Sequence, residues 1–523
     1  MRLRRIIAAL ACLALAACSQ PEEELTFPTP SMSAERDAFT IAFATQITNL
    51  SINAESGIAN FYLAALTSEG LLACDPTGEL VPGLAESWQV EGNKWVFQLR
   101  PGTLFQDGMA VTPEDVVFSL ELALDPQRSP GLVSYIPDYI RSVEATGESE
   151  VTVTLDGPHA DFGANLTPGG GMTIISKSVY ESAAYFGSAS DLMVATGPYM
   201  VTHFTSDSIT LLRSDSYWGG AHGPRLVRIV FIPDEQERLD ALRSGSIDVA
   251  MSVPLTNASQ WTSAGKVVYF SDRSYQGLTL DPTVAPFDDP HVRKAIAYSI
   301  DKMRLISEVL DGHGQAATGI DAPAQLAALG GDDTDALVAA LPAYPHSLTL
   351  ALEEMAQSAV PEGFAVQLTY PAGYPEVGEA SLVVSACLAQ IGISVTVKEI
   401  PLEDWLMSVG DGEQGLAWMV YTPTTPIPWE ISSWLLNASG PTTNPANWTN
   451  KKVAAKMASI DTMTKPRDQL DAVLSATKTA LTEAIYVPVY WGETAMALRP
   501  GVQADDFDST TLRTNWVAAF TVK

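Results

Sequence analysis

Short stretches in which apolar and polar residues alternate recur along the chain, and turn-forming residues bound each of them. They include FTIAFAT (39–45), KWVFQLR (94–100), EVTVTLD (150–156) and SITLLRS (208–214). A period of two places the apolar side chains on one face of an extended segment. The pattern therefore predicts strands that each bury one face.

A change to helical spacing follows the turn dipeptide Asp107-Gly108. Thr112 stands where an N-cap belongs, Pro113 occupies the first helical position, and Asp115 lies three residues after the cap. These residue types satisfy or remove the amide donors that a helix leaves unpaired at its start. Apolar residues then repeat at helical spacing over 116–124. We predict a capped helix with one buried face.

Helices and strands alternate through the rest of the chain. Residues 234–250 and 289–312 read as helical, and each stretch ends near glycine. Between 364 and 400, a strand, a helix and a strand follow one another, which predicts a parallel pair with a right-handed crossover. Residues 316–345 are rich in Ala, Gly and Asp and poor in aromatics, so we predict a surface excursion there. The pattern as a whole indicates a mixed α/β protein.

The length and the net charge of the chain limit the number of domains and the class of partner that can be expected. A chain of 523 residues exceeds one typical core, so two or three packed units are expected, and 46% hydrophobic residues indicate a folded body. The formal net charge is −31. Nucleic acid is a poor partner for such a surface, because phosphate binding needs clustered Lys and Arg. The acidity indicates solubility or a salty habitat rather than a specific cationic ligand.

The N-terminus predicts export. A basic start precedes an apolar run over 6–17, which is too short for a membrane span and fits a signal peptide over 1–17. Residues 15–18 (LAAC) also resemble a bacterial lipobox, in which Cys18 is acylated; an ordinary signal peptide with a chance cysteine is the alternative. The polar stretch 18–36 reads as a flexible tether. The remaining Cys74 and Cys387 are expected as free thiols rather than as a disulfide.

Catalytic and metal-binding patterns are missing from the sequence. The chain has six histidines without metal-ligand spacing: His159, His203, His222, His291, His313 and His346. No nucleophile elbow or phosphate loop occurs. GHGQAA (312–317) follows a helix instead of a strand, so it predicts a helix end and a loop rather than a dinucleotide site. We expect neither enzymatic activity nor a cofactor.

Several segments, in this order, resemble the bacterial extracellular solute-binding proteins of family 5. These proteins are the peptide- and nickel-binding components of ABC importers. The resemblance rests on 80–126 (LVPGLAESWQV to ALDP), 195–220 (ATGPYM to YWGG), 285–319 (APFDDPHVRKAIAYSID to AATG), 391–405 (IGISVTVKEIPLEDW) and 486–491 (YVPVYW). It covers the chain from about residue 37 to the C-terminus. Each segment alone is mostly structural, and the order makes the set specific.

The resemblance implies an α/β periplasmic binding protein fold of two lobes, class II-like, with three domains around a ligand cleft. Domain I would comprise 37–75, 195–284 and 485–523, domain II would be inserted at 76–194, and domain III would be the second lobe at 285–484. Ligand contacts from both lobes would stabilise the closed state selectively. The implied function is capture of peptides or a peptide-like solute in the periplasm for an importer's permease and ATPase subunits.

The implied binding site departs from the family pattern. Peptide binders of this family commonly carry a Trp followed three residues later by an Asp that pairs with the peptide's ammonium group. Trp418 matches the Trp, but Tyr421 stands in the acidic position. A non-peptide solute, such as an oligosaccharide, an opine-like conjugate or a metal chelate, is therefore the alternative. Both rings could instead be core aromatics.

Further contacts are expected from the loop 53–62. There, Glu55, Ser56 and Ile58 are candidate ligand contacts, with an ordinary solvent-facing loop as the alternative. Glu55 or Asp404 could also hold a ligand ammonium in place of the missing acid. We expect a monomer that is anchored to a membrane through lipid on Cys18.

Overall fold

The computed structural model describes residues 38–523 apart from 76–77, 133–134, 138, 160, 373, 402–403, 406–407, 409–414, 437–443, 461 and 505–506. The predicted signal peptide, the tether and Cys18 therefore lie outside the described residues. No helix in the described part is long and apolar enough to cross a membrane.

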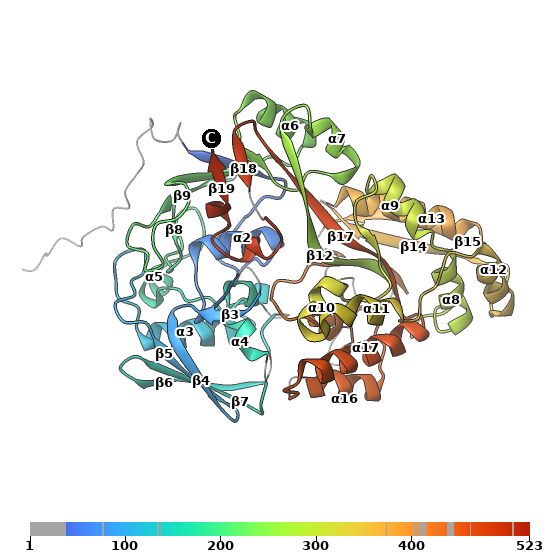
Figure 1. Cartoon of the computed structure of the whole chain (residues 1–523), viewed down its shortest axis with the longest axis horizontal. Helices are drawn as coiled ribbons and strands as arrows, with labels where there is room; N and C mark the ends of the chain where they lie inside the picture. Colours follow the sequence, from blue (N-terminus) through green and yellow to red (C-terminus); the bar gives the residue numbers. More distant parts are fainter. Residues whose placement is uncertain are drawn as a thin grey trace, which may run out of the picture.

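A nine-stranded mixed sheet runs through the middle of the molecule (Figure 1). Its strand order is β16-β12-β17-β11-β1-β10-β9-β8, and β13 pairs with β17 beside this path. The strands are β1 (Phe39–Phe43), β8 (Tyr199–Phe204), β9 (Ser208–Arg213), β10 (Leu226–Phe231), β11 (Val249–Ala250), β12 (Lys266–Leu280), β13 (Gln315–Ala316), β16 (Leu416–Tyr421) and β17 (Tyr486–Leu498). β1 is parallel to β10 and β11, whereas the other pairs are antiparallel.

We call residues 38–284 and 485–523 the first lobe and residues 285–484 the second lobe; these boundaries remain a prediction. In the first lobe, a core covers the sheet around β1, β8, β9 and β10, with α2 (Ile58–Thr67) and the C-terminal residues packed on it. Other elements of this lobe are β2 (Leu72–Cys74), β3 (Leu80–Pro82), α6 (Glu235–Ser244), α7 (Ala258–Trp261), η6 (Thr511–Arg513), β18 (Val502–Ala504) and β19 (Phe520–Val522).

A second core of the first lobe lies under a four-stranded antiparallel sheet, β4-β5-β7-β6. Its elements are β4 (Ala85–Glu91), β5 (Lys94–Leu99), α3 (Pro113–Leu124), β6 (Ile140–Gly147), β7 (Glu150–Leu155), α4 (Phe162–Asn165), η3 (Pro168–Gly170) and α5 (Lys177–Ser182). The predicted cap of α3 is confirmed: Thr112 Oγ1 accepts from the Asp115 amide at 3.2 Å, and Asp115 Oδ2 accepts from the Thr112 amide at 3.1 Å.

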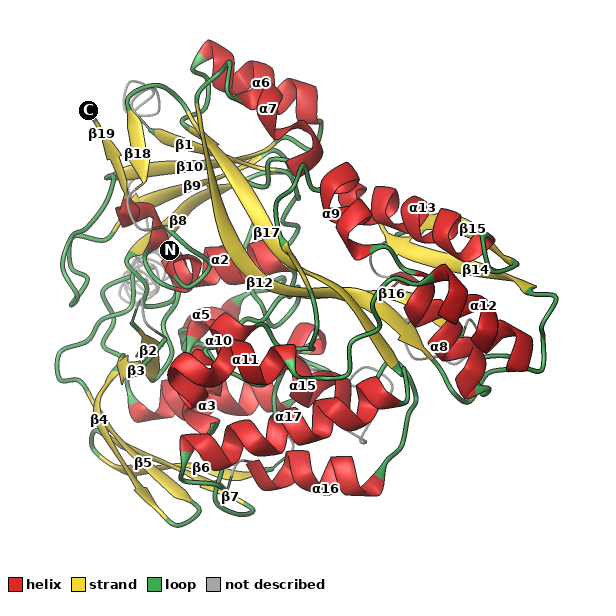
Figure 2. Ribbon diagram, turned by 45° about the vertical axis from the view of Figure 1, so that its right-hand side comes forward, coloured by secondary structure: helices red, strands yellow, loops and turns green. Residues whose placement is uncertain are grey.

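Two further cores contain the elements of the second lobe, and both also include residues of the first lobe. In one, α8 (Pro290–Ser299), α9 (Lys302–Val309), α12 (Leu348–Gln357) and α13 (Pro375–Ala389) pack against the parallel pair β14 (Phe364–Pro371) and β15 (Ile393–Ile400). In the other, α10 (Pro323–Gly330), α11 (Thr334–Ala339), α15 (Glu430–Leu436), α16 (Lys451–Ile460) and α17 (Pro466–Thr482) pack together. Figure 2 shows these two groups on either side of β16.

The chain leaves the first lobe just after the long strand β12 and returns to it just before β17, and β12 also pairs with β16 of the second lobe (Figure 2). β12 and β17 pair from Lys266 and Leu498 to Thr279 and Tyr486, with a register shift between Ser271 and Tyr275. Within this shift, Arg273 has a φ of 58°, which side-chain-bearing residues rarely adopt in a strand. The pair is therefore irregular just before the part of β12 that pairs with β16 of the second lobe.

Most of the predicted elements are confirmed, including the four alternating strands and the β14-α13-β15 unit. The surface excursion predicted over 316–345 is wrong, because the helices α10 and α11 lie there, and Ile320, Leu326 and Val338 of this stretch are buried in a core. The helical stretch 289–312 is interrupted, since Asp301 caps a new helix, α9. Cys74 and Cys387 are free thiols.

Candidate ligand-binding site

β16 carries both aromatic residues that the sequence singled out, and it forms one edge of the large sheet. Trp418 is fully buried in the core under α8 and α13, and its indole Nε1 donates to Gln276 Oε1 at 3.0 Å. Tyr421 belongs to the core built by α15 and α17. Three residues along a strand reach the opposite face, so the two rings do not meet. Their role as ligand contacts remains a prediction.

Glu430, at the start of α15, lies beside Tyr421 and is 4% exposed. Its Oε1 accepts from the Tyr421 hydroxyl at 3.3 Å and from the Thr424 amide and hydroxyl at 3.0 and 3.4 Å. Its Oε2 accepts from the Thr425 amide at 2.9 Å and from the Thr425 hydroxyl. Burial, and next the negative charge of Glu430, raise the pKa of Tyr421 well above its usual value. Glu430 thus fixes the loop that follows β16.

The loop that follows β16, residues 422–428, makes direct contact with the first lobe. Arg513, in η6, donates to the Thr425 carbonyl at 2.6 Å and to the Pro423 carbonyl at 2.9 Å. On another side of the loop, Gly169 of η3 lies so close that an added Cβ would stand 2.1 Å from the Thr424 carbonyl oxygen. Both lobes therefore hold the same loop, through its amides from the second lobe and through its carbonyls from the first.

A small cavity lies where this loop meets the first lobe. Ile58 and Phe61 of α2 line it together with Thr422, Thr424, Ser509 and Arg513. The structure thus brings one predicted contact, Ile58, next to the segment that follows Tyr421. The cavity has room for little more than a water molecule, because the two lobes are in contact around it.

Aromatic rings continue the contact between the lobes. Tyr135, from the first lobe, lies 5.1 Å from the Phe61 ring centroid and 5.5 Å from that of Trp434 in α15. The Trp434 ring lies 4.9 Å from that of Tyr421. The predicted contact Ser56 lies near the Tyr135 hydroxyl, whose pKa is raised chiefly by burial. Ser56 therefore lies at the junction of the lobes.

The two acids proposed as substitute ammonium partners lie in different surroundings. Glu55 Oε2 accepts from the Thr48 amide at 2.8 Å, the Thr48 hydroxyl at 2.7 Å and the Asn49 amide at 2.7 Å. Asp404 is exposed. The structure does not bring either acid to Tyr421 through a hydrogen bond, so their roles as ligand contacts remain predictions.

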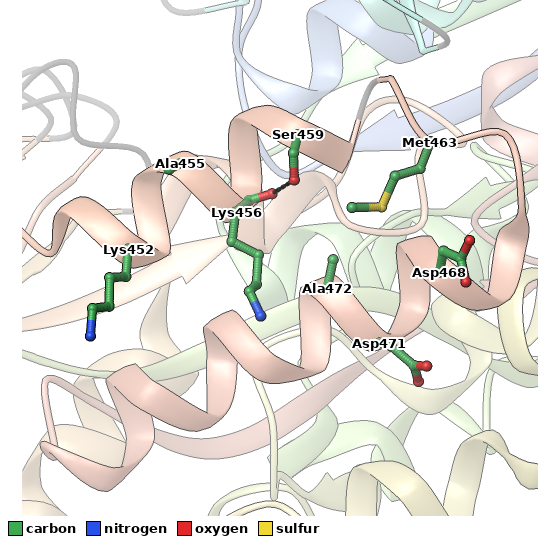
Figure 3. A pocket seen from close by; sticks show the side chains of 8 residues that line it. All are labelled: Lys452, Ala455, Lys456, Ser459, Met463, Asp468, Asp471 and Ala472. Atoms are coloured by element: carbon green, nitrogen blue, oxygen red, sulfur yellow. Dashed lines mark hydrogen bonds between the residues drawn. The ribbon is translucent and has the colours of Figure 1, made fainter.

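A larger groove of about 540 Å³ lies between α16 and α17 (Figure 3). Lysines line it from α16 and aspartates from α17: Lys452, Lys456, Asp468 and Asp471. Lys456 Nζ already donates to Ser475 Oγ at 2.8 Å, and Asp471 pairs with Arg467 at 3.2 Å. The groove involves the second lobe alone, so closure of the lobes would not enclose a ligand there.

Two residues of this site escaped the sequence analysis. An acid within the apolar run PIPWEISSWLL (426–436) is a signal that could have found Glu430, because a buried carboxylate needs partners. Arg513 gives no such signal. Among the described residues, no group of His, Cys, Asp and Glu could hold a metal ion.

Comparisons with known proteins identify the family. The family described as "Bacterial extracellular solute-binding proteins, family 5 Middle" matches residues 79–443. The chain belongs to this family. The resemblance seen in the sequence is confirmed, and family 5 proteins are the solute-binding components of ABC importers. A similar curated protein is the probable di/tripeptide-binding protein 5 of Pseudomonas aeruginosa, 28% identical over 369 residues, which are 65% of this chain and 68% of that protein.

Solved structures confirm the periplasmic binding protein fold. The periplasmic binding protein AgaA from A. tumefaciens R10, in complex with agropinic acid, matches with a TM-score of 0.79 and 21% identity, covering 93% of this chain and 99% of that one. DppA from Helicobacter pylori, in complex with the peptide STSA, matches with a TM-score of 0.78 and 22% identity, covering 94% and 99%. These identities establish the fold alone.

Proposed function

We propose that this family 5 protein captures a peptide or peptide-like solute between its lobes and delivers it to the permease of an ABC importer. The cavity that α2, η6 and the loop 422–428 surround supports a solute-binding site at the junction of the lobes. Residues from both lobes line the cavity, so a ligand bound at this junction stabilises the closed state selectively. The di/tripeptide-binding relative and the peptide-bound neighbour support the class of solute.

A non-peptide solute is the second candidate, favoured by one observation. Tyr421 stands where peptide binders of the family carry the acid for the ammonium group, and the neighbouring Glu430 already accepts five hydrogen bonds. The neighbour AgaA, which binds agropinic acid, supports an opine-like conjugate.

Mass spectrometry of solute released from the purified protein separates the two candidates. The protein is purified without denaturation, its mass is measured in the native state, and the co-purified molecule is identified after unfolding. A peptide mass supports the first candidate and an opine-like or saccharide mass the second. A protein that carries no solute and also fails to bind peptides and opine-like conjugates in calorimetry would contradict solute capture.

We also propose that Cys18 carries the lipid that anchors the protein, with 18–36 as the tether. The lipobox-like residues 15–18 support this proposal. Cys18→Ser should transfer the protein from the membrane fraction to the soluble fraction after cell lysis. A variant that remains in the membrane fraction would contradict the anchor.

A further inference from the structure

His313 stands in the turn between α9 and β13, within the stretch GHGQAA at 312–317. The glycines on either side of it, Gly312 and Gly314, have φ values of 84° and 94°, which side-chain-bearing residues rarely adopt. The His313 amide donates to the Leu310 carbonyl at 2.8 Å. The stretch therefore forms a tight turn that fixes the backbone of one histidine.

The imidazole of His313 contacts both long strands of the large sheet. Its Nδ1 lies 3.1 Å from Glu493 Oε2 on β17, and its ring stacks on Tyr269 of β12, with the centroids 3.8 Å apart and the planes 9° from parallel. A carboxylate only accepts hydrogen bonds, so Nδ1 carries a proton and donates it. The histidine thus joins the second lobe to two strands of the first.

The contact of His313 crosses the register shift between these strands. Glu493 pairs with Ser271 on one side of the shift, and Trp491 pairs with Tyr275 on the other side. β13, which follows the turn, pairs with β17 at Trp491. The turn is therefore attached to β17 on one side of the irregularity, and His313 reaches the strands on the other side. A change in the bend of the strands would move the imidazole relative to Glu493.

The elements around the imidazole also carry other charged side chains. They include Arg273 of β12, Lys302, Arg304 and Glu308 of α9, and Asp311 of the turn itself. Arg273 donates to Thr510 Oγ1 at 3.4 Å, Lys302 donates to the Ala317 carbonyl at 2.7 Å, and Arg304 pairs with Glu308 at 3.0 Å. Burial, and next the negative charge of Asp311, raise the pKa of Tyr269, so its ring stays neutral at neutral pH. These cations have other partners, and Glu493 is left for the imidazole.

A second proton on the imidazole strengthens both of its contacts. Histidine is the side chain that typically gains or loses a proton between pH 5 and 8. An imidazolium is attracted by a carboxylate and by the face of a tyrosine ring, whereas the neutral ring keeps only the hydrogen bond and the stacking. Low pH therefore favours the bend of the strands in which the lobes are in contact.

We propose that His313 is a positioning residue for solute capture, and that its protonated form stabilises the closed arrangement of the lobes through Glu493 and Tyr269. This inference rests on the proposed function and adds to it that solute is bound more tightly as the pH falls. His313 need not touch the solute, because it acts through the strands that connect the lobes.

Calorimetry with trialanine at pH 5.5 and 7.5 tests the proposal. The measured quantity is the ratio of the dissociation constant at pH 7.5 to that at pH 5.5. His313 and Glu493 are 29% and 31% exposed, so we expect this ratio to be about two- to fivefold larger for the wild type than for His313→Gln, the effect of an exposed ion pair. Glutamine keeps a donor but does not titrate. Glu493→Gln should lower the ratio similarly, because it removes the partner charge.

The ionisation of the peptide contributes equally to every protein and cancels when the ratios are compared. His291→Gln is the matched control, because His291 Nδ1 lies 2.6 Å from Glu354 Oε2 and both residues belong to the second lobe; its ratio should equal that of the wild type. Equal ratios for the wild type and His313→Gln, or an equal drop in His291→Gln, overturn the role of His313 and leave solute capture intact. Failure of trialanine, N-acetyl-trialanine and agropinic acid to bind the wild type at either pH would overturn both proposals.

Discussion

A carboxylate that accepts five hydrogen bonds inside a protein has no capacity left for a ligand's ammonium group. Glu430 is such a group, and Tyr421 beside it offers a neutral hydroxyl that already donates to it. The polar groups around Tyr421 therefore form hydrogen bonds within the loop 422–428 and with Glu430. At the scale of the residue, this arrangement separates the protein from the pattern of peptide binders described above.

Acetylation of a peptide's amine should consequently have little effect on binding. We expect the dissociation constants of trialanine and N-acetyl-trialanine to differ by less than about tenfold, since the charge-assisted hydrogen bond to an acid is missing. Isothermal titration calorimetry on the wild type measures both. Strong binding of the free amine with complete loss on acetylation would show that another acid, such as Glu55 or Asp404, holds the ammonium group.

Asp321 should make the stability of the second lobe depend on pH. It is 3% exposed, accepts from the Ser432 amide at 3.1 Å and from the Ser432 hydroxyl, and burial raises its pKa to about 7. The folded protein then holds a proton that the unfolded chain releases near pH 4. The stabilising contribution of this proton is complete below about pH 4 and is lost as the pH rises towards 7.

Asp321→Asn should weaken this pH dependence. The melting temperature of the wild type should fall between pH 4.5 and 7.5, and that of the variant should fall less, because its amide does not titrate. Differential scanning calorimetry gives both curves. Asp332→Asn, at an exposed aspartate eleven positions further along the chain, is the control. Identical slopes for Asp321→Asn and the wild type would contradict the assignment.

At the scale of the element, η3 and the loop 422–428 are in backbone contact where the two lobes meet. Gly169 lets the two backbones approach, because an added Cβ would lie 2.1 Å from the Thr424 carbonyl oxygen. Real Cβ atoms do not come so close to a backbone atom, and no flexible side chain can move away. The contact therefore requires glycine only when the lobes are together.

Gly169→Ala should weaken ligand binding more than it weakens the fold. The added methyl group clashes in the closed state and is relieved when the lobes separate, so the population of the closed state falls and the dissociation constant rises. We expect a loss of at least about tenfold in affinity, measured by calorimetry with trialanine. Gly157→Ala, where an added Cβ meets nothing within 4 Å, should bind like the wild type. Equal affinities for all three proteins would contradict closure through this contact.

Elements with a local signal were predictable, and contacts between distant segments were not. The capping box of α3 and the alternating strands follow from neighbouring residues, which is why residues 113–124 fold as expected. The α10 and α11 helices were missed because each is short and buries only two residues, one of them polar, so the apolar periodicity is weak. Ile58 was found through the family resemblance. Arg513 was not, since its carbonyl partners lie 88 and 90 residues away and only the fold joins them.

At the scale of the whole molecule, the chain passes from the first lobe to the second just after β12 and returns just before β17. β12 and β17 pair along their length and lose register between Ser271 and Tyr275. Such an irregularity weakens the ladder locally and allows the strands to bend. We propose that this bend is the hinge for solute capture.

Small-angle X-ray scattering with and without saturating solute tests the central claim most directly. The probe is trialanine or the solute identified by mass spectrometry. The account predicts a larger radius of gyration for the solute-free protein than for the protein with saturating solute. Identical curves with and without saturating solute would contradict capture by closure of two lobes.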